Sequence, residues 1–159
     1  MSIIYLSLGT NLGDRKANLL GAVDALPPGV TVQAESTIYE TPPWGYEDQP
    51  AFLNMAIKGE TGLKPELLLK YIKQLEVRLG RQPSFPWGPR LIDIDLLFYD
   101  ALVMETPQLK IPHPSLQERA FVLVPLADIA PDLVHPALGK TMRQLLEGLD
   151  KTGIVPVSE

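Results

Sequence analysis

The chain has 159 residues, of which 45% are hydrophobic and 21% are charged, so it is long enough to fold as one domain around a core of its own. Its net charge of −5 argues against general nucleic-acid binding, which needs a positive field over much of the surface. It contains no cysteine, which excludes disulfides, thiolate catalysis and metals bound through sulfur.

The apolar periodicity predicts strands and helices that alternate along the chain. In chain order we expect a strand over residues 3–8, a helix over 14–26, a strand within 30–39, a strand over 51–58, a helix over 65–79, a strand over 91–99, and helical segments over 116–130 and 141–149. Loops rich in proline separate some of them, at 41–50 and 81–90. Because no Gly-rich nucleotide fingerprint is present, the pattern favours an α+β sandwich, in which helices pack on one mostly antiparallel sheet in a single domain over 1–159.

The amino terminus and the hydropathy of the chain bear on its location. No apolar run is long enough to span a bilayer, and residues 1–9 lack the basic start of a signal peptide. We therefore expect a cytoplasmic protein, monomeric and without a nucleic-acid or membrane partner.

The strand expected at 91–99 carries an acidic pair. Its alternating apolar residues should share the core face: Ile92, Ile94, Leu96 and Phe98. Asp93 and Asp95 then project together from the other face, with Cα atoms roughly 6.5–7 Å apart. Carboxylates at this spacing suit a pair of Mg²⁺ ions that share their ligands with phosphate oxygens. The alternative is two ordinary acids on a solvent-exposed face.

Two arginines border the loop that leads into this strand. Trp87-Gly88-Pro89-Arg90 comes directly before it, and Arg81 begins the same loop. Arginine stays protonated, and its planar fork of donors fits phosphate oxygens. The alternative is that both arginines pair with surface acids, but that alternative does not explain the rigid Trp-Gly-Pro sequence beside the acidic pair.

Residues 87–97 read W-G-P-R-L-I-D-I-D-L-L, which is similar to the signature of the 6-hydroxymethyl-7,8-dihydropterin pyrophosphokinase family. Further segments resemble the family in the same order: L-G-T-N-L-G-D at 8–14, Y-x-T-P-P at 39–43, D-Q-P-x-F-L-N at 48–54, E-x-x-x-G-R at 76–81 and I-P-H-P at 111–114. The resemblance implies a ferredoxin-like fold, two Mg²⁺ ions and ATP as donor. The activity it implies is transfer of pyrophosphate to the pterin in folate biosynthesis, with AMP as the other product.

The resemblance also implies roles for individual residues. Asp93 and Asp95 would hold the metals and, with Arg81 and Arg90, form the catalytic group. The ATP-binding residues would be Arg81, Arg90, Leu96, His113 and Arg119. The pterin would lie between Phe52 and Phe121, and its edge would be read by Asn54 with Thr41, Pro42 and Trp44. Phe52 and Asn54 are two residues apart on a strand, so a stacking ring and an amide should face the same way.

Several of these residues have structural alternatives. Phe52 and Phe121 could be core residues, and a histidine held between two prolines, as His113 is, is often structural. Glu76 matches the family, with support of Arg81 as its alternative role. The turn after residue 8 could cradle a phosphate, but we favour a turn in which the glycines serve the backbone and Asn11 or Asp14 caps the next helix.

The loop at 82–86 departs from the family pattern, because it holds Gln82-Pro83-Ser84-Phe85-Pro86 where many members have basic residues. No strong general base is evident, and Asp95 is the nearest candidate. Two other functions remain open at this point. A metal-dependent phosphoesterase would use the same acids with water as nucleophile, and a non-catalytic ligand-binding domain would need no metal.

Overall fold

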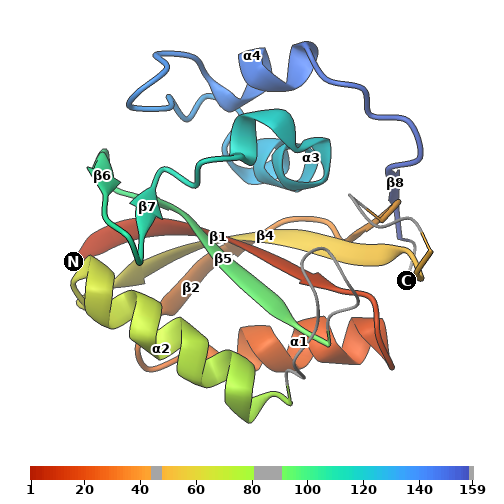
Figure 1. Cartoon of the computed structure of the whole chain (residues 1–159), viewed down its shortest axis with the longest axis horizontal. Helices are drawn as coiled ribbons and strands as arrows, with labels where there is room; N and C mark the ends of the chain where they lie inside the picture. The colour runs from red at the N-terminus through yellow and green to blue at the C-terminus, as the bar shows by residue number, and fades with distance from the viewer. Residues whose placement is uncertain (44–47, 81–90, 158–159) are drawn as a thin grey trace.

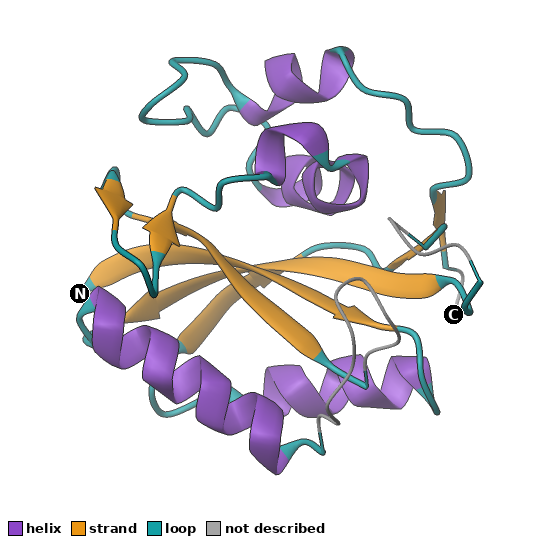
Figure 2. Ribbon diagram, viewed as in Figure 1, coloured by secondary structure: helices purple, strands orange, loops and turns teal. Residues whose placement is uncertain are grey.

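The computed structural model describes residues 1–43, 48–80 and 91–157. Figure 1 shows the chain as a twisted sheet with helices on both sides, and Figure 2 shows the same layers coloured by type. The elements in chain order are β1 (Ser2–Thr10), α1 (Arg15–Ala25), β2 (Thr31–Glu35), β3 (Tyr39–Thr41), β4 (Phe52–Thr61), α2 (Pro65–Arg78), β5 (Asp93–Tyr99), β6 (Met104–Glu105), β7 (Lys110–Ile111), a 3-10 turn (Leu116–Glu118), α3 (Ala120–Ile129), α4 (Met142–Glu147) and β8 (Val155–Pro156).

The main sheet is antiparallel and has the order β5-β1-β4-β3-β8, and β2 also pairs with β4. Strands β5 and β4 flank β1, and each helix of the first half connects two strands of this sheet. This is the β-α-β-β-α-β arrangement of a ferredoxin-like sandwich, so the expected fold class is confirmed. No helix among the described residues is long and apolar enough to cross a membrane.

Two cores lie on opposite faces of the sheet. Helices α1 and α2 cover one face, and the predicted stripe of Leu68, Ile72 and Leu75 is buried there. Helix α3 covers the other face and α4 packs on the far side of α3, and a second cluster there includes Leu123 and Leu126. The candidate site lies on the α3 side, because Leu53 and Met55 of β4 face the first core and leave Asn54 on the opposite face.

The predicted orientation of Phe98 was wrong. A β-bulge shifts the register between Tyr5 and Leu6, so that Phe98 pairs with Tyr5 and packs in the cluster beneath α3. The two rings meet edge to face with centroids 6.2 Å apart. An extra residue in one strand reverses the alternation beyond it, and the apolar sequence of β5 carries no mark of where that happens.

Two other boundaries differ from the prediction. The strand expected within 30–39 is divided into β2 and β3 at Ser36. There the Ala56 amide of β4 donates its hydrogen bond to the Ser36 side-chain Oγ instead of to a backbone carbonyl, which interrupts the regular pairing. Helix α3 begins at Ala120 instead of 116, because Arg119 has an extended backbone that separates it from the preceding 3-10 turn. Helix α4 is capped by Thr141, whose hydroxyl oxygen accepts a hydrogen bond from the Gln144 amide.

Candidate active site

The sheet brings the acidic pair and the predicted pterin residues into adjacent positions on one face. Asp93 on β5 is the register partner of Gly9 on β1, and Gly9 is in turn the partner of Asn54 on β4. Neighbouring strands lie about 4.8 Å apart, so Asp93 and Asn54 are roughly 10 Å apart across the glycine. Asp95 lies opposite Ser7 in the next row of the same face. This row from Asp93 through Gly9 to Asn54 is called the cross-sheet row below.

Gly9 has a role that the sequence analysis missed. We expected it to serve the turn before α1, but it lies within β1. A Cβ atom at this position would come within 2.6 Å of Asn54 Nδ2 and 3.7 Å of Phe52 Cδ2. Only glycine lets both side chains lie across the strand, which also confirms that Phe52 and Asn54 face the same way.

Asn54 is held in one orientation by Thr41. The Thr41 hydroxyl donates to Asn54 Oδ1 over 2.6 Å, and both side chains are buried. Because the carbonyl end of the amide is engaged there, the Nδ2 end is the one that lies over Gly9. The amide therefore presents its donor end to the space between β4 and the aspartates.

Phe121 and Pro42 border a hollow of about 310 Å³ between the start of α3 and the end of β3. Phe121 occupies the first turn of α3, and Pro42 directly follows β3. The Arg119 guanidinium lies 5.7 Å from the centroid of the Phe121 ring. A cation predicted to bind phosphate and a ring predicted to stack on the pterin thus lie together at the start of α3.

Asp95 has a pKa raised to about 7, mainly by burial and then by the negative charge of Asp93, while Arg119 acts in the opposite direction. Two carboxylates held this closely favour a shared cation. Within residues 1–43, 48–80 and 91–157, no group of three or more histidine, cysteine or acidic side chains is placed to hold a metal. An ion bound by this pair would therefore need oxygen ligands from elsewhere, which fits Mg²⁺ because it commonly shares its shell with substrate phosphates and water.

His113 lies close enough to Asp93 and Arg119 for their charges to shift its pKa. Its Nδ1 accepts a hydrogen bond from the Ser115 amide over 3.2 Å, which leaves the Nε2 end of a neutral ring as the donor. Burial and then the positive charge of Arg119 lower the pKa of His113 to about 4, although Asp93 acts in the opposite direction. The structure thus gathers Asp93, Asp95, His113 and Arg119 into one electrostatic group.

Glu76 anchors the strand that carries the aspartates. It is 1% exposed, and its Oε2 accepts a hydrogen bond from the Ile94 amide over 2.8 Å. Lys73 Nζ lies 3.6 Å from its other oxygen. The sequence does place an acidic residue four positions after Ile72, on the buried side of α2, which is a signal that Glu76 has a buried partner. It does not show that this partner is the Ile94 amide at the edge of β5.

Leu96 has its side chain in the core on the face opposite the aspartates, where it is 5% exposed. If Leu96 contacts ATP as predicted, the contact is made by its main chain. This main chain lies two residues beyond Ile94 along the outer edge of β5. Trp44, Arg81 and Arg90 lie outside the described residues, as does the loop at 82–86. Their roles stay predictions.

The turn before α1 has a different use from the one expected for Asn11. Asp14 is the cap, since its Oδ1 accepts from the Ala17 amide. Asn11 instead donates through Nδ2 to Gln49 Oε1 and to the Pro50 carbonyl. It ties the end of β1 to the segment that enters β4.

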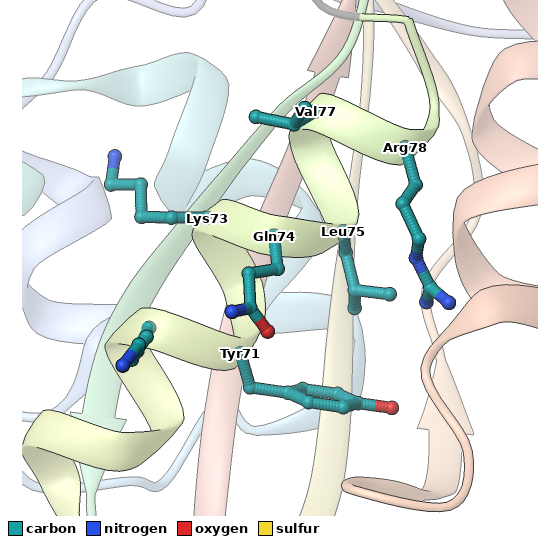
Figure 3. Close-up of a pocket in the computed structure, with 7 residues that line it drawn as sticks. Tyr71, Lys73, Gln74, Leu75, Val77 and Arg78 are labelled. Atoms are coloured by element: carbon teal, nitrogen blue, oxygen red, sulfur yellow. The ribbon is translucent and has the colours of Figure 1, made fainter.

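A further hollow lies along the outer side of α2, and Figure 3 shows the side chains that line it. None of them is a predicted site residue: Lys70, Tyr71, Lys73, Gln74, Leu75, Val77 and Arg78. Tyr71 has a structural role here, because its hydroxyl donates to the Leu26 carbonyl and accepts from the Gly29 amide. Tyr71 thus connects α2 to the end of α1.

Comparison with known proteins gives a consistent result. A family model described as 7,8-dihydro-6-hydroxymethylpterin-pyrophosphokinase matches residues 5–131. The 2-amino-4-hydroxy-6-hydroxymethyldihydropteridine pyrophosphokinase of Methylorubrum extorquens is 49% identical over 156 residues, which cover 97% of this chain and 98% of that one. The enzyme of the same name from Aquifex aeolicus is 43% identical and is covered to 90%, with 91% of this chain aligned.

Other relatives are longer than this chain. It spans 23% of the folic acid synthesis protein FOL1 of Dictyostelium discoideum, to which it is 45% identical over 96% of its own length. A crystal structure of Plasmodium falciparum HPPK-DHPS with pteroate matches with a TM-score of 0.75 over 92% of this chain and 42% of that one. At 19% identity this likeness bears on the fold alone.

Proposed function

Because the chain belongs to the 7,8-dihydro-6-hydroxymethylpterin-pyrophosphokinase family, we propose that it transfers pyrophosphate from ATP to 6-hydroxymethyl-7,8-dihydropterin in folate biosynthesis. The products are AMP and the pterin diphosphate. The observation that carries the proposal is the cross-sheet row, in which an acidic pair and an oriented amide share one face with only Gly9 between them. A phosphoesterase that uses water has no need for the amide end of this row.

The acidic end binds the donor. Asp93 and Asp95 would hold two Mg²⁺ ions, which would supply positive charge to neutralise the phosphates. Arg119 acts on the same group from the start of α3, and neutral His113 donates from its Nε2 side. Arg81 and Arg90 are the further cations in this scheme. These residues position the triphosphate and stabilise the charge that develops on it.

The amide end binds the acceptor. Asn54 offers its Nδ2 hydrogens to an acceptor atom on the pterin edge, and the Thr41 hydroxyl keeps it in that orientation. Phe52 and Phe121 supply apolar faces for the ring, with Pro42 and Trp44 at its border. A flat ring held over Gly9 has its hydroxymethyl group on the side of the aspartates, so that its oxygen lies in line with the β-phosphorus.

The chain does not need a dedicated base for this reaction. Asp95 has the raised pKa that would suit one, but a carboxylate bound to a cation accepts protons poorly. Catalysis then rests on positioning and charge neutralisation, as is usual for phosphoryl transfer. The proposal also covers a single domain over 1–159 that works as a cytoplasmic monomer without a nucleic-acid or membrane partner.

Thermal unfolding with stepwise addition of ligands tests the proposal. Mg²⁺ with a non-hydrolysable ATP analogue should raise the melting temperature, and the pterin should raise it further once the nucleotide is bound. A pterin effect that is absent at every nucleotide concentration would favour the phosphoesterase. Nucleotide-independent binding with no response to Mg²⁺ would favour a non-catalytic binding domain.

A further inference from the structure

The family match ends at residue 131, but the chain beyond it returns to the sheet beside the candidate pterin site. Figure 1 shows the segment after α4 passing the end of α3 and reaching the sheet edge at β8. There Val155 pairs with Glu40 and Pro156 with Tyr39, and the Val157 amide donates to the Ile38 carbonyl over 2.9 Å. Residues 149–157 are called the C-terminal strap below.

Strand β3 depends on outside support because it is only three residues long. It pairs with β4 on one side and with β8 of the strap on the other. In addition, the Tyr39 hydroxyl donates to the carboxylate of Asp128 on α3, with both oxygens within 2.9 Å. The residue at the end of β3 is Thr41, which orients Asn54. Whatever fixes β3 therefore also fixes the amide that reads the pterin.

The strap also lies behind the residues that border the pterin. The hollow beside Phe121 and Pro42 is completed by four strap residues, Leu149, Asp150, Thr152 and Ile154. The strap turns sharply here, since the Ile154 amide donates to the Lys151 carbonyl and Gly153 has φ +84°. This positive φ favours glycine.

Gly153 lies next to Pro42. A Cβ atom at Gly153 would lie 3.4 Å from Pro42 Cγ and 3.6 Å from Pro42 Cδ, which is ordinary van der Waals contact, so alanine would touch Pro42 without displacing it. A side chain that extends beyond its Cβ atom would press on the segment that joins β3 to the pterin border. Gly139 offers a matched comparison, because its φ is +70° and no atom lies within 4 Å of the position of its Cβ.

We propose that the C-terminal strap is a positioning element for the pterin: through β8 and Gly153 it holds Thr41 and Pro42 in place, and so sets the affinity for the acceptor but not for ATP. This rests on the proposed function, since it assumes that the pterin binds at Asn54. The strap touches neither Asp93 nor Asp95 in the pairing of the sheet, so the donor end of the row should not respond to it.

The test compares Gly153→Leu with Gly139→Leu in the full chain. Both place a side chain at a left-handed position, so both should lower the melting temperature to a similar extent. Only Gly153→Leu, whose side chain extends beyond the Cβ atom that already contacts Pro42, should weaken pterin binding, with the Kd from calorimetry and the KM for pterin rising on the order of tenfold, while the KM for ATP stays unchanged.

A second pair of variants tests the strap through its hydrogen bond. Val157→Pro removes the amide that bonds to Ile38, whereas Val157→Ala keeps it. The proline variant should reproduce the pterin-specific loss, and the alanine variant should not. This pair decides the question if Gly153→Leu does not fold.

The outcomes separate the two proposals. If the wild type neither binds the pterin nor forms AMP from ATP in its presence, the proposed function fails and the role of the strap fails with it. If the wild type does both, but the members of each pair do not differ in pterin affinity, the positioning role of the strap alone is overturned. Equal losses in ATP and pterin affinity would overturn it as well.

Discussion

Asp93 and Asp95 are only two residues apart, and both are partly exposed on the open face of the edge strand β5. Replacing either with alanine removes little packing and relieves repulsion between the carboxylates, so the variants should still unfold cooperatively. Turnover should be lost in both because the cation site is incomplete. Steady-state rates at the usual Mg²⁺ concentration, with a melting curve for each variant, check this. Near wild-type turnover in either variant would mean that the metal site lies elsewhere.

The raised pKa of Asp95 predicts a pH dependence of stability in the metal-free protein. Its pKa is raised from 3.8 to about 7, so the stability it contributes is fully present below about pH 3.8 and is lost as the pH rises through about 7. Asp95→Asn has no proton to lose. Its free energy of unfolding relative to wild type should therefore increase between about pH 4 and pH 8, on the order of 2 kcal/mol.

The measurement is urea unfolding with a chelator present, at several pH values. His113 acts in the opposite direction, since its pKa is lowered to about 4 and its contribution is lost as the pH falls below about 6.5. Because wild type and Asp95→Asn share His113, their difference isolates the carboxyl. A difference that does not change with pH would show that Asp95 is not shifted in this way.

Gly9 predicts a steric effect on acceptor binding. Gly9→Ala would place a methyl group 2.6 Å from Asn54 Nδ2, so the amide must move and pterin affinity should fall, on the order of tenfold. Gly21→Ala is the control, because no atom lies within 4 Å of that position in α1 and helix propensity should raise stability by about 0.5–1 kcal/mol. Calorimetry with the pterin checks both variants. An unchanged affinity for the pterin in Gly9→Ala would show that the pterin does not bind at Asn54.

At the scale of elements, α2 and β5 are joined by one buried carboxylate. Glu76→Ala leaves the Ile94 amide without its acceptor and should cost about 1–3 kcal/mol of unfolding free energy. Because Ile94 lies between the two aspartates, turnover should fall as well. Glu76→Gln keeps an acceptor oxygen and should recover most of both. If glutamine is as damaging as alanine in unfolding and rate assays, the charge of Glu76 matters more than this hydrogen bond.

The elements also show which features of the sequence were sufficient for prediction. Alternation in β4 and in the first part of β5 predicted the faces of Asn54 and the aspartates, because each strand there is regular. It failed for Phe98, where the bulge depends on the partner strand β1. It gave no sign of β8, a two-residue strand whose existence depends on β3 far away in the chain. Short elements made by long-range pairing have no local period to detect.

For the molecule as a whole, the fold follows from interleaved strands and helices, but the site depends on register. The sequence indicated both ends of the cross-sheet row and could not indicate the glycine between them, because Gly9 matters only through its approach to Asn54. Thr41 was expected beside the pterin from the family resemblance, but its hydrogen bond to the Asn54 amide could not be read from the sequence. Residues that bind ligands have recognisable chemistry, whereas residues that orient them are identified by contacts.

The central claim for the whole molecule is that the pterin oxygen attacks the β-phosphorus of ATP. A plain kinase and an ATPase both release ADP, whereas transfer of the β,γ unit releases AMP. The wild-type chain is incubated with Mg²⁺ and ATP, with and without 6-hydroxymethyl-7,8-dihydropterin, and the nucleotides and pterins are separated and quantified. We predict AMP and pterin diphosphate in equal amounts, with little AMP when the pterin is omitted, because water is a poor substitute for an oriented hydroxymethyl oxygen. ADP as the main product, or AMP that forms regardless of the pterin, would contradict the account.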